Sequence, residues 1–246
     1  MSVSTPQISP TVRDFCDCGG VVEFDSSKIM DEFKITAPAT VMISGGSQSG
    51  KTTLVSEMIT RLDEVFDRPP HQIVYCFSRD QPAYDEIKKK ASIPIEFVEG
   101  LDPSLRPKPG TLLIIDDLQD KSELIQDYFT KNTHHFDLIT IYITQNLFLK
   151  TAHHRTCNLN THVLCVFKNP RDKLQISCLA RQIYPNNNKF LMDSYAQATE
   201  KAHGYLVLNL QQRCPEAYRV RDSFFPKDAH FFVDKKGYNE LKLDTL

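Results

Sequence analysis

The feature that most constrains this chain is the segment 41–53, V-M-I-S-G-G-S-Q-S-G-K-T-T. A short apolar run leads into a turn of small residues, after which a helical pattern begins. Gly45, four further residues and then Gly50-Lys51-Thr52 match the spacing G-x-x-x-x-G-K-[ST]. Glycine permits backbone angles at which successive amide N–H groups converge on one anion, and the start of the helix adds its positive end. The segment therefore predicts a phosphate-binding loop, or P-loop.

The P-loop predicts ATP and Mg²⁺ as ligands. Lys51 can reach the β- and γ-phosphates, and the Thr52 hydroxyl can ligate Mg²⁺. The alternative is an ordinary glycine-rich turn, but the chain has only 9 glycines, and the strand before and helix after are what the motif requires. The residues expected to bind the nucleotide are Gly45, Gly46, Ser47, Gln48, Ser49, Gly50, Lys51, Thr52 and Thr53.

Length and composition agree with one large α/β domain. The chain has 246 residues, of which 41% are hydrophobic and 24% charged, as in soluble globular proteins. A net charge of −2 disfavours a uniformly basic nucleic-acid binder but allows a local basic patch. No secretory signal or membrane-spanning run is visible, and seven scattered cysteines are typical of reduced thiols. We therefore expect an intracellular protein.

Apolar runs predict alternating strands and helices, and hence an α/β, mainly parallel sheet with helices on both faces. Strands are expected at 41–44, 73–77, 95–98, 111–117, 138–146, 162–169 and 204–210. Helices are expected from the P-loop to residue 65, near 84–90, from 124 to the His134-His135 pair, over 170–183 and over 188–200. The expected division is an N-terminal arm with a possible edge hairpin (1–37, the hairpin over 21–37), an ATPase domain (38–225) and a C-terminal tail (226–246).

Polar residues end two of these strands. Asp116 and Asp117 close the run T-L-L-I-I-D-D, where Asp116 is placed to hold Mg²⁺ and Asp117 to orient or deprotonate an attacking water. A solvent-facing acid pair is the alternative interpretation. Gln145 closes the following strand, where its amide can sense the γ-phosphate by hydrogen bonding, or can simply cap a loop.

Four motifs together carry a family resemblance. G-G-S-Q-S-G-K-T-T, L-L-I-I-D-D, I-T-Q-N-L-F and F-K-N-P-R-D, in this order and spacing, resemble the FtsK–HerA superfamily of DNA-pumping ATPases. The closer similarity is to the packaging-ATPase branch found in poxvirus A32-like proteins, Polinton/Maverick elements and adintoviruses. The resemblance covers residues from about 38 to 225, and the Q-N-L-F and N-P-R-D motifs are its more discriminating part.

The resemblance implies an ASCE/RecA-like P-loop NTPase fold and an ATP-driven ring, expected to be a hexamer, that threads double-stranded DNA into a capsid. It implies that Lys51 and Thr52 hold phosphate and Mg²⁺, that Asp116 and Asp117 form the Walker B pair, and that Gln145 is the sensor. Partners would be DNA and a capsid or portal protein, in a virus factory, a host nucleus or cytoplasm, or the virion. Many family members carry Glu where this chain has Asp117, which weakens the assignment of the water-activating role.

Two arginines are candidates for a residue that reaches into a neighbouring subunit's site and neutralises charge in the transition state. Arg155 lies in the segment 146–160, expected to be a loop, and Arg171 lies within N-P-R-D. A surface salt bridge is the alternative for both, and for Arg171 a pairing with Asp172 at the start of a helix is a further one. Arg171 ranks first because Pro170 would fix the backbone before it.

Two other functions are compatible with the sequence. A nucleoside or nucleotide kinase would need an arginine-rich lid, for which 181–183 (R-Q-I) and 219–221 (R-V-R) are the available segments. A nucleotide-gated scaffold would bind ATP without turnover. Hydrolysis stimulated by DNA, hydrolysis that requires a nucleoside, and binding without hydrolysis distinguish the three.

Overall fold

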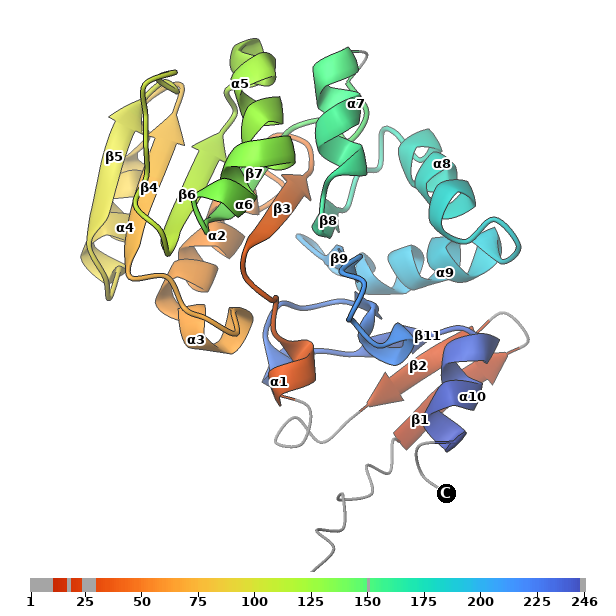
Figure 1. The fold of residues 1–246 in the computed structure, drawn as a ribbon. Helices are drawn as coiled ribbons and strands as arrows, with labels where there is room; N and C mark the ends of the chain where they lie inside the picture. The colour runs from red at the N-terminus through yellow and green to blue at the C-terminus, as the bar shows by residue number, and fades with distance from the viewer. Residues whose placement is uncertain (1–10, 17–18, 24–29, 150, 244–246) are drawn as a thin grey trace, which may run out of the picture.

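A computed structural model describes residues 11–16, 19–23, 30–149 and 151–243. The strands within these ranges form one 11-stranded sheet in the order β1-β2-β11-β10-β9-β8-β3-β7-β6-β4-β5 (Figure 1). The parallel half comprises β3 (Ala39–Ser44), β4 (Gln72–Phe77), β5 (Ile95–Glu99), β6 (Thr111–Asp116), β7 (Ile139–Thr144) and β8 (Val163–Phe167). The antiparallel half comprises β9 (Tyr205–Asn209), β10 (Val220–Arg221), β11 (Phe231–Val233), β2 (Gly19–Glu23) and β1 (Thr11–Cys16). The predicted α/β fold is confirmed.

Helices cover both faces of the parallel half. One face is covered by α2 (Lys51–Thr60), α3 (Leu62–Val65) and α4 (Pro82–Lys90). The other is covered by α5 (Ser122–Asp127), α7 (Ala152–Leu159), α8 (Leu174–Ile183) and α9 (Asn188–Ala198). Residues Tyr128–Asn132 continue α5 as a π-helical turn into α6 (Thr133–His135), while α1 (Met30–Phe33) and α10 (Lys235–Leu243) lie beside the antiparallel half. Because side chains alternate along each strand, neighbours such as Met42 and Ile43 enter opposite cores.

The helix predicted from the P-loop to residue 65 is interrupted at Arg61. Its backbone leaves the helical region there, with φ −131° and ψ 40°, and separates α2 from α3. The Arg61 side chain pairs with Glu57 and Glu64, and its guanidinium lies 3.8 Å from the centre of the Phe225 ring. Contacts with a residue far along the chain thus accompany a break that apolar periodicity does not reveal.

Strands near both ends of the described chain belong to the sheet. The hairpin predicted over 21–37 is instead formed by β1 and β2, earlier in the chain, and part of the predicted segment lies outside the described residues. Strand β11 comes from the predicted tail and pairs with both β10 and β2. Arg221 of β10 is 1% exposed, donates to the Phe33 carbonyl at 2.8 Å and stacks its guanidinium on the Phe33 ring.

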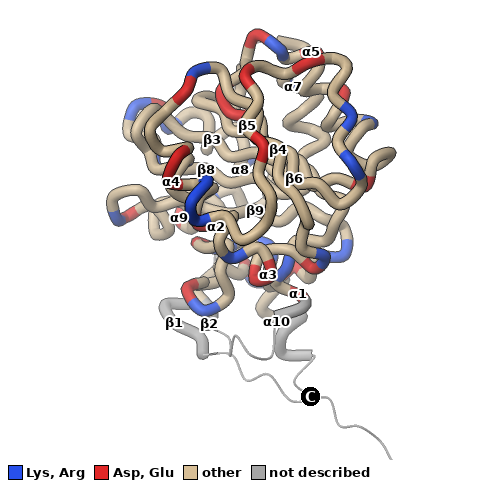
Figure 2. Tube along the Cα trace, turned by 90° about the vertical axis from the view of Figure 1, so that its left-hand side faces the viewer, with Lys and Arg blue, Asp and Glu red and all other residues tan. Residues whose placement is uncertain are grey.

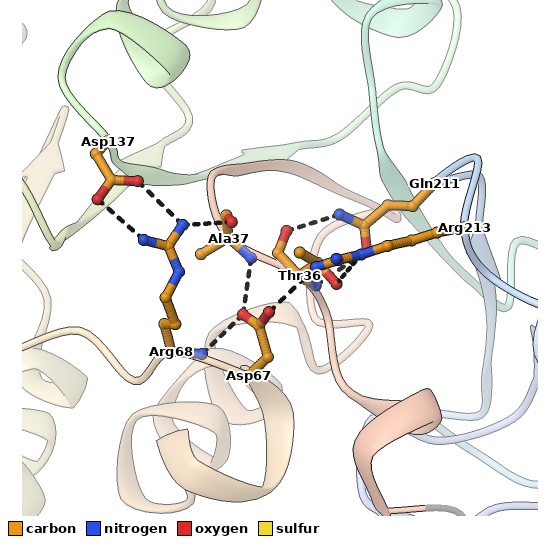
Figure 3. Close-up of polar contacts among 7 residues, drawn as sticks. All are labelled: Thr36, Ala37, Asp67, Arg68, Asp137, Gln211 and Arg213. Carbon is orange, nitrogen blue, oxygen red and sulfur yellow. Dashed lines mark hydrogen bonds and ion pairs between the residues drawn. The ribbon is translucent and has the colours of Figure 1, made fainter.

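A polar edge cluster holds the start of β3 at the amino edge of the parallel strands (Figure 3). Its members are Thr36, Ala37, Asp67, Arg68, Asp137, Gln211 and Arg213. Asp67 accepts hydrogen bonds from the Ala37 amide at 2.9 Å and from Arg213 at 3.3 Å, and Arg68 pairs with Asp137 at 3.2 Å. Loops before β3, before β4, before β7 and after β9 therefore meet where the P-loop strand begins.

Charged residues of both signs are intermixed over the β5 side of the molecule (Figure 2). The lysine run Lys88–Lys90 ends α4 and is exposed, with Lys89 paired to Glu86 at 3.1 Å. The run is therefore a solvated face of the helix. Within the described ranges, no helix has the length and apolar character needed to cross a membrane.

Two histidines, one buried and one half-buried, make stability depend on pH. Burial lowers the pKa of His154, whose Nε2 lies 3.0 Å from the Leu147 carbonyl, and burial also lowers the pKa of His162, whose Nδ1 accepts from the Thr40 amide. Below the ordinary histidine pKa of 6.5 these two side chains therefore bind more protons in the unfolded chain than in the folded chain. We expect the free energy of unfolding to fall as pH drops from 7 through this region.

Urea denaturation at a series of pH values tests this expectation. His154→Gln should flatten the dependence between about pH 7 and 5.5, whereas His135→Gln, at an exposed position, should leave it as in the wild type. Equal slopes for the wild type and His154→Gln would contradict the assignment to His154.

Candidate functional site

The P-loop follows β3 directly, and its first residue is bonded to the neighbouring strand β7. The Gly45 amide donates to the Thr144 carbonyl of β7 at 3.2 Å, which fixes the start of the loop. Gln48 and Gly50 have φ values of 61° and 107°, in the left-handed region, and α2 begins at Lys51. Gly50 is therefore required by conformation. Gly45 is required by space, because a Cβ there would lie 2.7 Å from the Phe167 Cβ.

Lys51 is directed into the loop. Its Nζ donates to the carbonyls of Gly45 at 2.6 Å and of Gly46 at 2.8 Å. Burial lowers the pKa of Lys51, while the nearby carboxylates of Asp116 and Asp117 oppose that change. The ammonium therefore lies within electrostatic reach of both acids, in a position from which it can turn to a bound phosphate.

Strand order decides which residues surround the loop. In the sheet β7 lies between β3 and β6, so the carboxyl ends of these three strands bring together the P-loop, Gln145 and the acids of β6. This is a P-loop NTPase fold. Such folds bind ligands at the carboxyl ends of their parallel strands, which is where the P-loop, Gln145 and the acids of β6 gather.

Asp117 is held by two side-chain amides. Its backbone has φ 54°, a conformation that aspartate tolerates better than most residues. Oδ2 accepts from Gln145 Nε2 at 2.8 Å, and Oδ1 accepts from Gln119 Nε2 at 3.2 Å. Ser47 Oγ of the P-loop lies 3.5 Å from Gln145 Oε1, at the limit of a hydrogen bond. Gln145 thus bridges the P-loop and Asp117, a pairing that the sequence does not reveal, and the sequence interpretation also missed Gln119.

Asp116 lies deeper and is 5% exposed. Burial raises its pKa, while hydrogen bonds from the hydroxyls of Tyr75 and Tyr84 act in the opposite direction. With the Thr52 hydroxyl at the start of α2, Asp116 supplies the hard oxygen ligands that Mg²⁺ prefers. The donor chemistry therefore fits a magnesium ion held between β6 and the P-loop. Neither tyrosine was singled out in the sequence, where both resemble core residues.

Two hollows flank the P-loop. The first, of about 800 Å³, is lined by Gly46, Ser47, Gln48, Ser49, Gln145, Asn146, Lys168, Asn169, Pro170, Arg171, Asp172, Gln175 and His203. The second, of about 680 Å³, is lined by Gln48, Ser49, Gly50, Lys51, Thr52, Thr53, Leu54, Glu57, Gln81, Phe167, His203 and Tyr205. His203 lines both, has φ 61°, and its Nδ1 lies 3.1 Å from the Ser49 carbonyl. Every predicted nucleotide-binding residue except Gly45 lines at least one hollow.

The segment N-P-R-D is a turn, whereas the sequence predicted that a helix starts at Pro170. Asn169 Oδ1 accepts from the Arg171 amide at 3.1 Å, and Asp172 Oδ1 accepts from the Leu174 amide at 3.1 Å. These short side chains satisfy backbone donors in place of helical bonds, so α8 begins at Leu174. Arg171 is exposed at the rim of the first hollow.

Arg155 lies on a helix, and the prediction that 146–160 is entirely a loop is wrong. The Thr151 side chain caps α7 by accepting from the His154 amide at 3.2 Å. The buried side of this helix consists of His154 and Cys157, so aliphatic periodicity gives no signal. Arg155 is exposed and lines neither of the two hollows.

Solved ATPase structures are similar to this chain, but at low identity. The DNA-packaging ATPase B204 from Sulfolobus turreted icosahedral virus shares 14% identity over 72% of this chain and 94% of its own, with a TM-score of 0.46. EssC (ATPases 2 and 3) from Geobacillus thermodenitrificans shares 9% over 85% of this chain and 43% of its own, with a TM-score of 0.46. The cytoplasmic domain of the type VII secretion ATPase EccC from Thermomonospora curvata shares 10% identity over 80% of this chain and 25% of its own. Its TM-score is also 0.46.

No protein-family model matches the chain, and no curated protein matches it. Because all three TM-scores are below 0.5, functional conclusions rest on the site of this chain itself.

The two glycines of the G-G pair should differ in their tolerance of alanine. A Cβ at Gly45 would lie 2.6 Å from Ser49 Oγ and 2.7 Å from the Phe167 Cβ, whereas a Cβ at Gly46 would meet nothing within 4 Å. We expect Gly45→Ala to lower the free energy of unfolding by about 1–3 kcal/mol and Gly46→Ala to leave it nearly unchanged. Chemical denaturation measures both, and equal losses would contradict the described packing of the loop.

Proposed function

We propose that this chain is an ATP-hydrolysing motor that translocates double-stranded DNA and packages a viral or virus-like genome into a capsid. The observation that carries the hydrolytic part of the proposal is the bridge from the P-loop through Gln145 to Asp117. It joins a phosphate-binding loop to a carboxylate suited to activating water. A P-loop enzyme that transfers phosphate to a bound acceptor has less need of this second acid. The DNA-translocating and packaging part of the proposal is supported by the motif resemblance described above.

In this proposal each predicted residue has one task. The loop amides and Lys51 bind the phosphates, while Thr52 and Asp116 hold Mg²⁺, which neutralises phosphate charge when bound. Asp117 orients and deprotonates the attacking water, and Gln145 responds to the γ-phosphate. Since Gln145 already donates to Asp117, binding and release of that phosphate would change the hydrogen bonding of the catalytic carboxylate.

The link from hydrolysis to movement would run through the motifs Q-N-L-F and N-P-R-D. Gln175 of α8 accepts from the Leu147 amide at 3.1 Å and donates to Asp172 Oδ2 at 2.6 Å. The loop after Gln145 and the turn that carries Arg171 are therefore connected by one side chain. A rearrangement at Gln145 could be passed to the exposed turn by this route.

Oligomerisation and partners are further parts of the proposal. We propose a homo-oligomeric ring, a hexamer in the form that the sequence resemblance implies, with double-stranded DNA in its pore and a capsid or portal protein as partner. Arg171, exposed beside the P-loop, is the preferred candidate for the residue that acts across a subunit interface, ahead of Arg155. An intracellular or virion-associated location is consistent with this role.

The kinase alternative gains no support from the candidate lid arginines. Arg221 is buried against Phe33, and Arg219 pairs with Glu216 at 2.8 Å. Arg181 lies in the last turn of α8, at the opposite end of the helix from the first hollow. Arg219 and Arg221 are therefore held by other contacts, and Arg181 lies away from the hollow.

The decisive experiment measures ATP hydrolysis by the purified full chain alone, with double-stranded DNA, and with nucleosides. We expect stimulation by DNA and none by nucleosides. Lys51→Ala should reduce hydrolysis roughly 100-fold or more without loss of fold, because the ammonium neutralises phosphate charge. Lys131→Ala, at a side chain that is 68% exposed, serves as the matched control. Turnover by Lys51→Ala equal to wild type would contradict nucleotide hydrolysis at this site.

Asp117→Asn tests the water-activating role. The amide cannot accept a proton from water, so we expect hydrolysis to fall roughly 100-fold or more while ATP binding persists. Asp120→Asn, three residues away and 71% exposed, should behave as wild type. If Asp117→Asn hydrolyses ATP normally, the general base lies elsewhere. The acids of β5 would then be the next candidates, although β4 separates them from β6.

A further inference from the structure

Two tyrosines converge on one oxygen of Asp116. The Tyr75 hydroxyl, from β4, lies 2.8 Å from Asp116 Oδ2, and the Tyr84 hydroxyl, from α4, lies 3.1 Å from the same atom. Strand β4 pairs with β6, so Tyr75 reaches Asp116 from the adjacent strand, whereas Tyr84 approaches from the helix that covers this face. Both hydroxyls donate, because an ionised carboxylate can only accept.

The rings have little freedom to move. Tyr75 is 0% and Tyr84 is 4% exposed. Their centroids lie 5.0 Å apart, and each ring also packs on Phe97, at 5.1 Å and 5.3 Å. Phe77 adds a contact to Tyr84 at 5.2 Å. The directions from which the two hydroxyls reach Asp116 are therefore set by the packing of aromatic rings.

Tyr84 also connects the acid to the second hollow. Gln81 Nε2 lies 3.2 Å from the Tyr84 hydroxyl oxygen and donates to it, while that hydroxyl donates to Asp116. Gln81 lines the hollow together with Lys51, Thr52 and the next residues of α2. A chain of hydrogen bonds thus runs from the wall of the hollow to the carboxylate.

We infer that Tyr75 and Tyr84 are positioning residues that hold Asp116 in the orientation in which it binds the cation. Two donors on Oδ2 oppose rotation of the carboxylate and leave Oδ1 directed to one place. Neutral donors accomplish this without cancelling the negative charge, as a lysine or arginine partner would. The inference rests on the proposed function, since it assumes that Asp116 serves a nucleotide-bound Mg²⁺.

The test uses the full chain and measures binding of a fluorescent, non-hydrolysable ATP analogue as the Mg²⁺ concentration is varied. Tyr75→Phe and Tyr84→Phe keep the rings and remove only the hydroxyls. For each we expect the Mg²⁺ concentration at half-maximal effect to rise about 10-fold or more, as when partners of metal ligands are removed elsewhere. Affinity for the analogue in EDTA should remain that of the wild type.

Tyr128→Phe is the matched control. Tyr128 is also 4% exposed, and its hydroxyl donates to the Leu105 carbonyl at 3.2 Å, away from Asp116. It should lose comparable thermal stability without changing the Mg²⁺ dependence. In an Asp116→Asn background, Tyr84→Phe should cause no further change in Mg²⁺ dependence, because the tyrosine acts only through the carboxylate.

Three results would overturn the inference. If the Mg²⁺ dependence of both tyrosine variants equals that of Tyr128→Phe, the hydroxyls have only a structural role. If affinity in EDTA falls as far as the Mg²⁺ response, the variants damage the whole site and do not act on the metal ligand. If the wild type binds no analogue at any Mg²⁺ concentration, or Lys51→Ala binds it equally well, the proposed function fails as well.

Discussion

The candidate site depends on the pairing of β7 with β3 on one side and with β6 on the other. The Gly45 amide donates to the Thr144 carbonyl, and the Asp117 amide donates to the Ile143 carbonyl, each at 3.2 Å. Two consecutive peptide groups of one buried strand therefore hold the start of the P-loop and the end of the acidic strand. Gln145 is the next residue, so its side chain enters the space between them. The distance between the P-loop and the acids of β6 is therefore set by the hydrogen bonding of three adjacent strands.

The two carboxylates are held mainly by neutral groups. Asp116 accepts from two tyrosine hydroxyls, and Asp117 accepts from two glutamine amides. Such donors orient a carboxylate oxygen without neutralising its charge. An arginine or lysine would orient the oxygen and neutralise the charge. The charges of both acids act on the Lys51 ammonium and oppose the lowering of its pKa by burial, yet its hydrogen bonds are to loop carbonyls. The proposed binding of a cation and of phosphate would use these negative charges and this positive group.

The antiparallel half of the sheet does not follow from the alternation of strands and helices along the sequence, which indicates a parallel sheet. Strands near the two ends of the described chain, β2 and β11, pair in it, and Arg221 is buried where a core hydrophobe would be expected. Its guanidinium is stabilised by the Phe33 carbonyl and ring. Arg61 similarly stacks on Phe225 at the break between α2 and α3. Arginine side chains thus connect the antiparallel half to α1 and to the break between α2 and α3.

The sequence by itself determined the P-loop, the strands and most helices, because glycine spacing and apolar periodicity are local properties. It also indicated Lys51, Asp116 and Gln145 as site residues, since polar groups that end parallel strands share one edge of a sheet. Only the tertiary structure decided their partners: Gln145 lies 28 residues from Asp117, and Tyr75 lies 41 from Asp116. Strand order brings such pairs together, and apolar runs contain no information about strand order. Apolar periodicity also does not predict a helix start that a capping side chain sets, as at Thr151, because one hydrogen bond decides that start.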